Sequence, residues 1–383
     1  MNKEIGWHRL DKNRSMAVWC PTKQGNVNAS VELHFNLWRL PRLSWWRKIR
    51  TWRWGAQPDF VEIGVLIDDR DQIESVGIFL PFRVKKLDVE DCGPSFRDKD
   101  IAEGIFNEKI SIEIPATESG AFVDLKVDGK AFCRVHEFEK SDSSISENQL
   151  ALTDVDHGTI LEISRHAIAA ATSDTQQEKR IYFRLRILIP KVRNNPFIQP
   201  IHPSDWALQS GFEEVELINF RLNEMRTLPD KVQNRLRQSG NAVNARVRLV
   251  AFLTAIPAIS DMTSSSSPPH KIRTLEREIW DTYVDNGLPD DVAVYHWRKS
   301  AKSEHDDAQV DEFSTFVKLK QRRAGLGTIA IYLLIAFAFG VSGNLAAGWL
   351  DTKFSLFSSP IKQAPEVELP TSEVEPGEEE QNK

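Results

Sequence analysis

The pattern of hydrophobic and polar positions along most of the chain is that of short β-strands. Through about residue 257, apolar and polar residues alternate in short runs, which places the apolar side chains of each run on one face of a strand. In residues 29–38, for example, Val31, Leu33 and Phe35 share one face. The predicted strands are 29–38, 60–67, 76–84, 109–114, 121–127, 131–138, 159–164, 180–189, 212–222 and 245–256.

Such runs at short spacing, with few helical patterns between them, predict a mainly β protein. The body is expected to be an antiparallel β-sandwich or barrel-like. A cluster of polar residues at 141–148 is a candidate boundary. The body therefore consists either of one large β domain or of two β-rich modules, 1–145 and 146–260.

Residues 261–323 have a different pattern and are predicted to form a connector. Residues 263–269 are rich in Ser and Pro, which indicates a linker. Apolar residues at 310–317 have helical spacing, and no helix breaker follows them before residue 324. The predicted helices are 228–240, 271–287 and a last one that continues from about 307 into the next segment.

Residues 324–350 are 27 consecutive residues without a charge. A helix rises about 1.5 Å per residue, so this run would extend roughly 40 Å, more than the hydrocarbon core of a bilayer at about 30 Å. It predicts a transmembrane helix followed by a disordered acidic tail, 351–383. Small residues on one face of the helix would let two copies approach closely, and a neighbouring amide could bond between them. The predicted association face consists of Ala336, Gly340, Gly343, Asn344 and Ala347.

Basic residues immediately before this run predict its orientation. The rule that positive residues flank the cytoplasmic end of a span places the body in the cytoplasm and the tail outside. The location would be the cell membrane, which is the inner membrane if the source is bacterial. The N-terminus has no apolar stretch of the kind that a secretory signal carries. The residues that set the orientation are Lys318, Lys320, Arg322 and Arg323.

Charge and cysteine content add little chemistry. The net charge is −6, and the tail accounts for most of it, so the body is close to neutral and any basic feature is local. Cys20, Cys92 and Cys133 are odd in number and far apart, which predicts reduced thiols rather than a disulfide framework or a metal site. Neither a metal nor a cofactor is predicted.

The most unusual part of the body is an insertion rich in Trp and Arg at 37–55. Cations beside indoles suit the surface of an anionic bilayer. The same mixture suits single-stranded nucleic acid or another anionic ligand. A loop whose indoles pack on the sheet explains it equally well. The candidate membrane-surface or anion-binding residues are Trp45, Trp46, Arg47, Lys48, Arg50 and Trp52.

A second basic feature lies in the predicted strand 180–189. Arg180, Arg184 and Arg186 point to one face, and apolar residues point to the other, which belongs in the core. The arginine face could line an anion-binding surface. A solvated strand face paired with nearby carboxylates is the alternative, and the pattern favours it.

The signals for catalysis are weak. Residues 154–158 and 304–307 mix His with carboxylates, as metal sites do, but both are also typical polar turns. Glu113 with Asp124 and Lys126 resembles part of the acidic set of metal-dependent nucleases, although an exposed strand face explains it without chemistry. The sequence contains no Gly-rich phosphate loop, nucleophile elbow or zinc spacing. An enzyme is therefore the less favoured interpretation.

These features predict a membrane protein with a cytoplasmic β domain. Its layout is similar to that of transmembrane effectors of prokaryotic antiviral systems, in which a soluble sensing domain is joined to a short membrane segment. That resemblance implies a domain that senses a ligand or partner and controls a membrane-acting span, with the lipid bilayer and further copies of the chain as partners. A constitutive scaffold that recruits a cytoplasmic partner and a membrane-tethered hydrolase are the alternatives.

Overall fold

The computed structural model divides the chain into two compact units, Met1–Arg323 and Ala324–Lys383. The first unit is the β-rich body, and the second contains a long helix. The described residues are 15–23, 28–40, 58–114, 122–156, 158–171, 180–189, 195–201, 213–237, 243–284, 287–288, 291–301, 308–322 and 326–355.

A main sheet organises the body, and ten strands form it within the described residues. In order across the sheet they are β18 (Lys271–Thr274), β19 (Val292–Ser300), β16 (Arg246–Pro257), β2 (Ser30–Trp38), β3 (Phe60–Ile67), β13 (Ile181–Leu188), β8 (Lys130–His136), β7 (Phe122–Val127) and β6 (Ile110–Glu113), with β5 (Val89–Asp91) paired to β13. Neighbouring strands are antiparallel except for two parallel pairs, β16 with β2 and β13 with β8. Strands before and after residue 145 share this sheet. The division of the body into modules 1–145 and 146–260 stays a prediction.

Smaller sheets pack against the main sheet. One has the strand order β1 (Ala17–Trp19), β4 (Val76–Leu80), β12 (Gly158–Ile163) and β11 (Leu150–Val155). Another has the order β14 (Ile198–Ile201), β15 (Glu213–Leu222), β20 (Phe313–Arg322) and β17 (Ser260–Ser265). Strands β9 (Lys140–Ser141) and β10 (Ser144–Ile145) form a separate pair. The resulting arrangement of packed sheets confirms the predicted mainly β, sandwich-like body.

The central core lies between the main sheet and the smaller ones. Alternate side chains of β2, including Val31, Leu33 and Phe35, are fully buried in it. Phe220 of β15 lies between two strands of the main sheet, with its ring centroid 5.0 Å from Phe35 and 4.3 Å from Phe252 of β16. The strand period of two thus sends one set of side chains into this core and leaves the other set on the opposite face.

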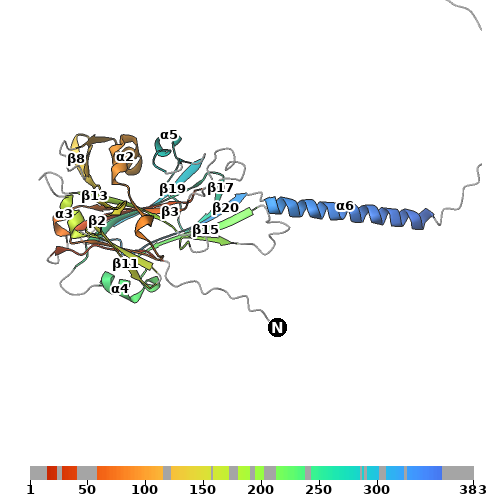
Figure 1. Ribbon diagram of the computed structural model, residues 1–383, viewed down its shortest axis with the longest axis horizontal. Helices are drawn as coiled ribbons and strands as arrows, with labels where there is room; N and C mark the ends of the chain where they lie inside the picture. The colour runs from red at the N-terminus through yellow and green to blue at the C-terminus, as the bar shows by residue number, and fades with distance from the viewer. Residues whose placement is uncertain are drawn as a thin grey trace, which may run out of the picture. The chain divides into compact units, whose positions relative to one another are not determined.

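Short helices cover parts of the remaining faces. They are α2 (Lys99–Phe106), α3 (Arg165–Ala170), α4 (Asp230–Arg237) and α5 (Arg277–Trp280), with the 3₁₀ turns η2 (Arg70–Gln72), η3 (Lys86–Asp88), η4 (Gly93–Arg97) and η6 (Met225–Thr227). Figure 1 shows α2 and α5 on one side of the body and α4 on the other. Ile101 of α2 and Trp280 of α5 pack against Trp38 and Phe60 of the main sheet. The main sheet is therefore covered on both faces over part of its area.

The prediction of a helix leading from residue 307 into the membrane segment is wrong. Residues Phe313–Arg322 form strand β20, which pairs with β15 along its length. Phe313, Thr315, Val317 and Leu319 are buried, and the residues between them are exposed or half-buried. That alternation outweighs the helical spacing because β15 offers a complete ladder of backbone partners.

Two other expectations for the connector are also wrong. The predicted linker 263–269 is partly strand, since β17 runs to Ser265 and pairs with β20. The predicted helix 271–287 begins as strand β18, and among its described residues only the short helix α5 is α-helical. Both β17 and β18 extend existing sheets by backbone pairing, which depends little on side-chain pattern. The helix predicted at 228–240 is confirmed as α4.

Helix α6 (Leu326–Ser355) makes up the described part of the second unit. Its stretch Ile329–Phe354 has 26 residues with a mean hydropathy of 2.0 and is long and apolar enough to cross a membrane. This is consistent with membrane anchoring. Near its end, the Lys353 ammonium lies 4.4 Å from the centroid of the Trp349 ring.

Candidate functional site

A cavity of about 470 Å³ lies on the face of the main sheet that points away from the central core. Strand β2 supplies the middle of its floor through four alternate residues, Glu32, His34, Asn36 and Trp38. These are the positions between the apolar residues that enter the core, so the strand period alone places them together. We call this cavity the sheet pocket.

Small residues on the neighbouring strands create the hollow around His34. The register places Ala251 of β16 on one side of His34 and Gly64 of β3 on the other. Glycine is required at position 64, since a Cβ there would lie 2.0 Å from the Tyr182 hydroxyl oxygen. That hydroxyl lies 3.3 Å from Nδ1 of His34. The imidazole of His34 therefore stands in a row of small residues on the floor, beside Tyr182 on the same face of the sheet.

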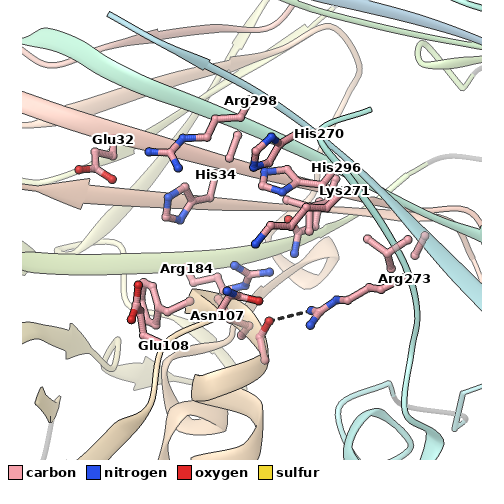
Figure 2. A pocket seen from close by; sticks show the side chains of 18 of the residues that line it. Glu32, His34, Asn107, Glu108, Arg184, His270, Lys271, Arg273, His296 and Arg298 are labelled. Carbon is pink, nitrogen blue, oxygen red and sulfur yellow. Dashed lines mark hydrogen bonds between the residues drawn. The ribbon is translucent and has the colours of Figure 1, made fainter. Parts of the chain in front are cut away.

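The walls of the sheet pocket come from α2 and β18. Helix α2 is capped at its C-terminal end by Asn107, which has left-handed backbone dihedrals (φ 57°), and the last turn of the helix faces the pocket. Arg273 of β18 donates a hydrogen bond to the backbone carbonyl oxygen of Gly104 in α2, at 2.8 Å. Figure 2 shows this bond closing one side of the pocket. The contact joins an edge strand to the helix above the sheet.

Basic residues gather on β18 and β19. The register pairs Lys271 with His296, and Figure 2 shows His270 beside His296 with Arg298 on the same side of the sheet. The rings of His270 and His296 lie 5.6 Å apart. Among the described residues, neither Lys271 nor Arg298 forms an ion pair with a carboxylate. We refer to Lys271, Arg273, Arg298, His270 and His296 as the basic cluster.

Burial, aided by nearby positive charges, lowers the pKa values of two histidines of the pocket, His34 and His296. Burial lowers the pKa of His34 to about 3, and Arg184, His296, Arg298 and Arg180 act in the same direction. Burial also lowers the pKa of His296 to about 4, aided by the other four members of the basic cluster. Both imidazoles are therefore neutral at pH 7. A negative charge placed near them would reverse the repulsive part of these shifts.

The strand 180–189 behaves differently from its favoured interpretation as a solvated face. Arg184 and Arg186 are 1% and 3% exposed and share one buried carboxylate, Glu62 of β3. Burial alone would raise the pKa of Glu62, but the two guanidiniums hold it below its usual value. The solvated interpretation is wrong because a second layer covers this face of the sheet. Of these arginines, Arg184 and Arg180 line the sheet pocket, and their use in anion binding stays a prediction.

Several nitrogen atoms of residues that line the pocket are buried and lack hydrogen-bond partners among the described residues. They are Nε1 of Trp38, Nε1 of Trp280 and Nε2 of His296. The two indoles are 2% and 3% exposed. A buried N–H without a partner costs about 1–3 kcal/mol, so such groups are seldom left unused. Because these atoms are not exposed to the cavity, they show how tightly its walls are packed and are not contacts for an occupant.

The weak catalytic candidates have structural roles where they are described. Asp124 forms an ion pair with the buried Arg134 at 2.7 Å, and Glu113 pairs with Lys126 at 2.5 Å. Asp154 pairs with Arg83 at 2.6 Å. The described residues contain no group of three or more His, Cys, Asp or Glu that could hold a metal ion. His157 and residues 304–307 lie outside the described residues.

The remaining predicted sites can be placed only in part. The tryptophans and basic residues at 45–52 lie outside the described residues. The small residues of the predicted association face are exposed on α6, and a Cβ added at Gly340 or Gly343 would meet no atom within 4 Å. Lys318 and Lys320 lie on β20, and Lys320 pairs with Glu213 at 2.8 Å. Arg323 lies outside the described residues.

The three cysteines are free and buried. Burial raises the pKa of Cys20 to about 12 and that of Cys92 further, so both thiols are protonated and unreactive near neutral pH. The predicted reduced state fits these positions.

Sequence reasoning missed the sheet pocket, although part of its signal was visible. The polar positions of residues 29–38 alternate with the core positions and include an imidazole and an indole. What joins them to the basic cluster is the register of β2 with β16, two strands more than 200 residues apart. No protein-family model matches the chain, and no curated protein is similar to it.

Proposed function

We propose that this chain is a single-pass membrane protein whose β-rich body binds a small ligand in the sheet pocket and thereby controls the span α6. The observation that carries the proposal is the pocket itself. It combines a concave site of about 470 Å³ with convergent polar groups and two histidines of strongly lowered pKa. Concave sites with these properties are typical of small-molecule binding.

A line of direct contacts connects the pocket with the strand that precedes the span. Arg39 directly follows the pocket strand β2 and forms an ion pair with Glu216 of β15, at 2.5 Å. The same guanidinium pairs with Asp59 at 3.1 Å. Strand β15 is the ladder partner of β20, and β20 ends at Arg322, only a few residues before α6 begins. A shift of β2 on ligand binding would therefore act on the strand that leads into α6.

The orientation follows from the basic residues near the start of α6. We place the body in the cytoplasm and the acidic tail outside, because Lys318, Lys320, Arg322 and Arg323 precede the span. The rule counts charges close to a span, so it holds although β20 is a strand. Protease added to spheroplasts should then trim the tail and spare the body.

The response of the span is proposed to be self-association. Lipid gives helices no hydrophobic reason to pair, so close packing and hydrogen bonds between helices must supply the attraction. The face with Gly340, Gly343 and Asn344 permits both. A bond of this kind is worth about 0.6 kcal/mol, up to roughly 2, so association is weak and open to control by the body.

Cysteine crosslinking of the span in reconstituted vesicles tests this function. The full chain with Gly343→Cys is oxidised with and without the low-mass fraction of an extract of the expression host. We expect the yield of disulfide dimer to change at least threefold with the extract. The native cysteines need no replacement, because they are buried.

A pocket variant supplies the control. Ala251→Trp fills the floor beside His34 and should remove the effect of the extract, whereas Ile272→Trp, at an exposed position of β18, should keep it. If the extract changes no yield in either background, the span is only an anchor and the scaffold alternative is favoured. The antiviral setting rests on the layout of the chain alone.

A further inference from the structure

The sheet pocket has two chemically different ends, and together they define a class of ligand. One end carries the basic cluster, and the other is apolar and aromatic, built around Trp38 and Trp280. We infer that the pocket binds a nucleoside phosphate, with the phosphate at the basic cluster and the base toward the two indoles. This inference rests on the proposed function and names the ligand class of the same site.

The basic end is suited to a phosphate by charge and by arrangement. Lys271 and Arg298 reach the pocket from the edge strand β18 and its neighbour β19. Neither forms an ion pair with a carboxylate among the described residues, although Arg298 acts electrostatically on Glu32, and Glu108 also lines the pocket. Glu32, the acid of the pocket floor, is engaged by Arg180 at 3.3 Å. Burial raises the pKa of Glu32, so even this carboxylate has a weakened tendency to ionise. Among the described residues that line the pocket, the cationic side chains therefore outnumber the carboxylates: Arg180, Arg184, Lys271, Arg273 and Arg298 face Glu32 and Glu108.

The central row of the floor extends the positive region beneath the ligand. Across the strands, the register runs from Arg298 through Ala251, His34 and Gly64 to Arg184. Arg184 shares the carboxylate of Glu62 with Arg186, and Arg186 also contacts the half-exposed Glu90 at 3.4 Å. An anion above Ala251 and Gly64 would lie between two guanidiniums, where the small side chains leave room.

The other end is suited to a heterocyclic base. Trp38, Val294 and Leu275 give it apolar walls, and they belong to the cluster that α5 covers. Within that apolar region, the indole N–H groups of Trp38 and Trp280 have no acceptor among the described residues. These N–H groups are not exposed to the cavity, so they do not select the ligand. The aromatic walls favour a planar heterocyclic base over an aliphatic chain for filling the apolar space.

Two simpler occupants fit less well. Inorganic phosphate would use the basic cluster but not the aromatic end, and a free nucleoside would do the reverse. A single nucleic-acid strand shares the chemistry, but α2 and β18 wall the cavity, and Arg273 bonds the two elements together. A ligand of mononucleotide size matches a pocket in the range of about 300–1,000 Å³ that small molecules occupy.

Calorimetric titration of the detergent-solubilised full chain tests the inference. The probes are the four common ribonucleoside 5′-mono- and triphosphates, the four nucleosides, inorganic phosphate and a ten-nucleotide RNA. We expect at least one nucleotide to bind ten times more tightly than its nucleoside and than phosphate. Lys271→Met with Arg298→Met should weaken that nucleotide at least tenfold. Lys299→Met, which changes the residue next to Arg298 on the opposite face, should leave it unchanged.

The aromatic end has its own variant. Trp280→Phe keeps an aromatic ring but removes part of the wall at this end, so it should weaken the nucleotide severalfold and leave any binding of phosphate unaffected. The inference is overturned if no nucleotide binds below 1 mM, if phosphate binds equally well, or if the RNA binds more tightly than every nucleotide. If no nucleotide binds but the extract still changes crosslinking at residue 343, and Ala251→Trp removes that change, only the ligand class is wrong. When both experiments fail, the proposed function fails too.

Discussion

Glu62 is the residue whose replacement should most damage the body without changing its shape. Its carboxylate is fully buried and contacts Arg184 at 2.5 Å and Arg186 at 2.9 Å. Glu62→Gln keeps the side-chain volume but removes the negative charge and turns an acceptor into a donor that faces one guanidinium. Arg184 would then retain only neutral partners, the hydroxyls of Tyr182 and Tyr283 at 2.9 and 3.1 Å.

The size of the effect follows from this burial. Removing one partner of a buried ion pair costs about 3–5 kcal/mol, because a buried charge is left uncompensated. Unfolding entropy is about 2.1 cal/mol/K per residue, so for a body of 323 residues 1 kcal/mol shifts the melting temperature by roughly 1.5 °C. Glu62→Gln should therefore lower it by roughly 4–7 °C.

Urea and thermal unfolding of the detergent-solubilised chain, followed by tryptophan fluorescence, measure this loss. The matched control is Glu90→Gln, since Glu90 contacts Arg186 at 3.4 Å but its side chain is 51% exposed. That change should cost less than about 1 kcal/mol. Equal small losses of unfolding free energy for both variants would show that solvent or another group neutralises Arg184 and Arg186. The reasoning that these arginines depend on Glu62 for their charge balance would then be refuted.

Three further predictions follow from other parts of the molecule. Burial lowers the pKa of His136 to about 4, so between pH 6.5 and 4 the unfolded chain binds a proton that the native state excludes. The free energy of unfolding should therefore fall as the pH drops through this range. His136→Gln should reduce the fall, which urea titrations at several pH values measure. Gly64→Ala should lower the unfolding free energy by about 1–3 kcal/mol, because its Cβ collides with Tyr182, and a stability equal to wild type would contradict the packing under His34. Gly340→Ile with Gly343→Ile should preserve membrane insertion in carbonate extraction but abolish crosslinking through a cysteine at 347, and undiminished crosslinking would exclude this face.

The strands of the body could be predicted because each follows a local rule. Residues 60–67 and 180–189 alternate or run apolar in a way that a buried strand requires, and both form where expected as β3 and β13. Strand β20 could not be predicted in the same way, because its apolar positions suit two periods. Only the presence of β15 as a partner selects the extended form.

The burial of the arginine row of β13, Arg184 and Arg186, could not be predicted from the sequence of that strand alone. Arginines are almost never fully buried unless they are paired, so a row of them indicates solvent. Glu62 was the available signal, as the lone acid in the otherwise apolar run of β3. Its meaning becomes clear only when the register places it opposite Arg186. The site thus depends on pairing between strands more than 100 residues apart.

The same register connects the stability of the body with its proposed binding chemistry. Glu62 carries one negative charge for two guanidiniums, and Glu90, the other acid of the group, is half exposed and screened by solvent. The two arginines are therefore balanced in part by a half-exposed carboxylate, and an anionic ligand beside His34 would add to that balance. A ligand that supplies this charge binds only the folded body, so it stabilises that body by an amount that grows with its concentration, about 2.7 kcal/mol at one hundred times its dissociation constant. Glu62→Gln should then lose stability but bind an anionic ligand more tightly, because one more positive charge is left uncompensated. A mutation that only disrupts the fold would weaken both, so measuring the two together separates a structural role of the arginine row from a role in the pocket.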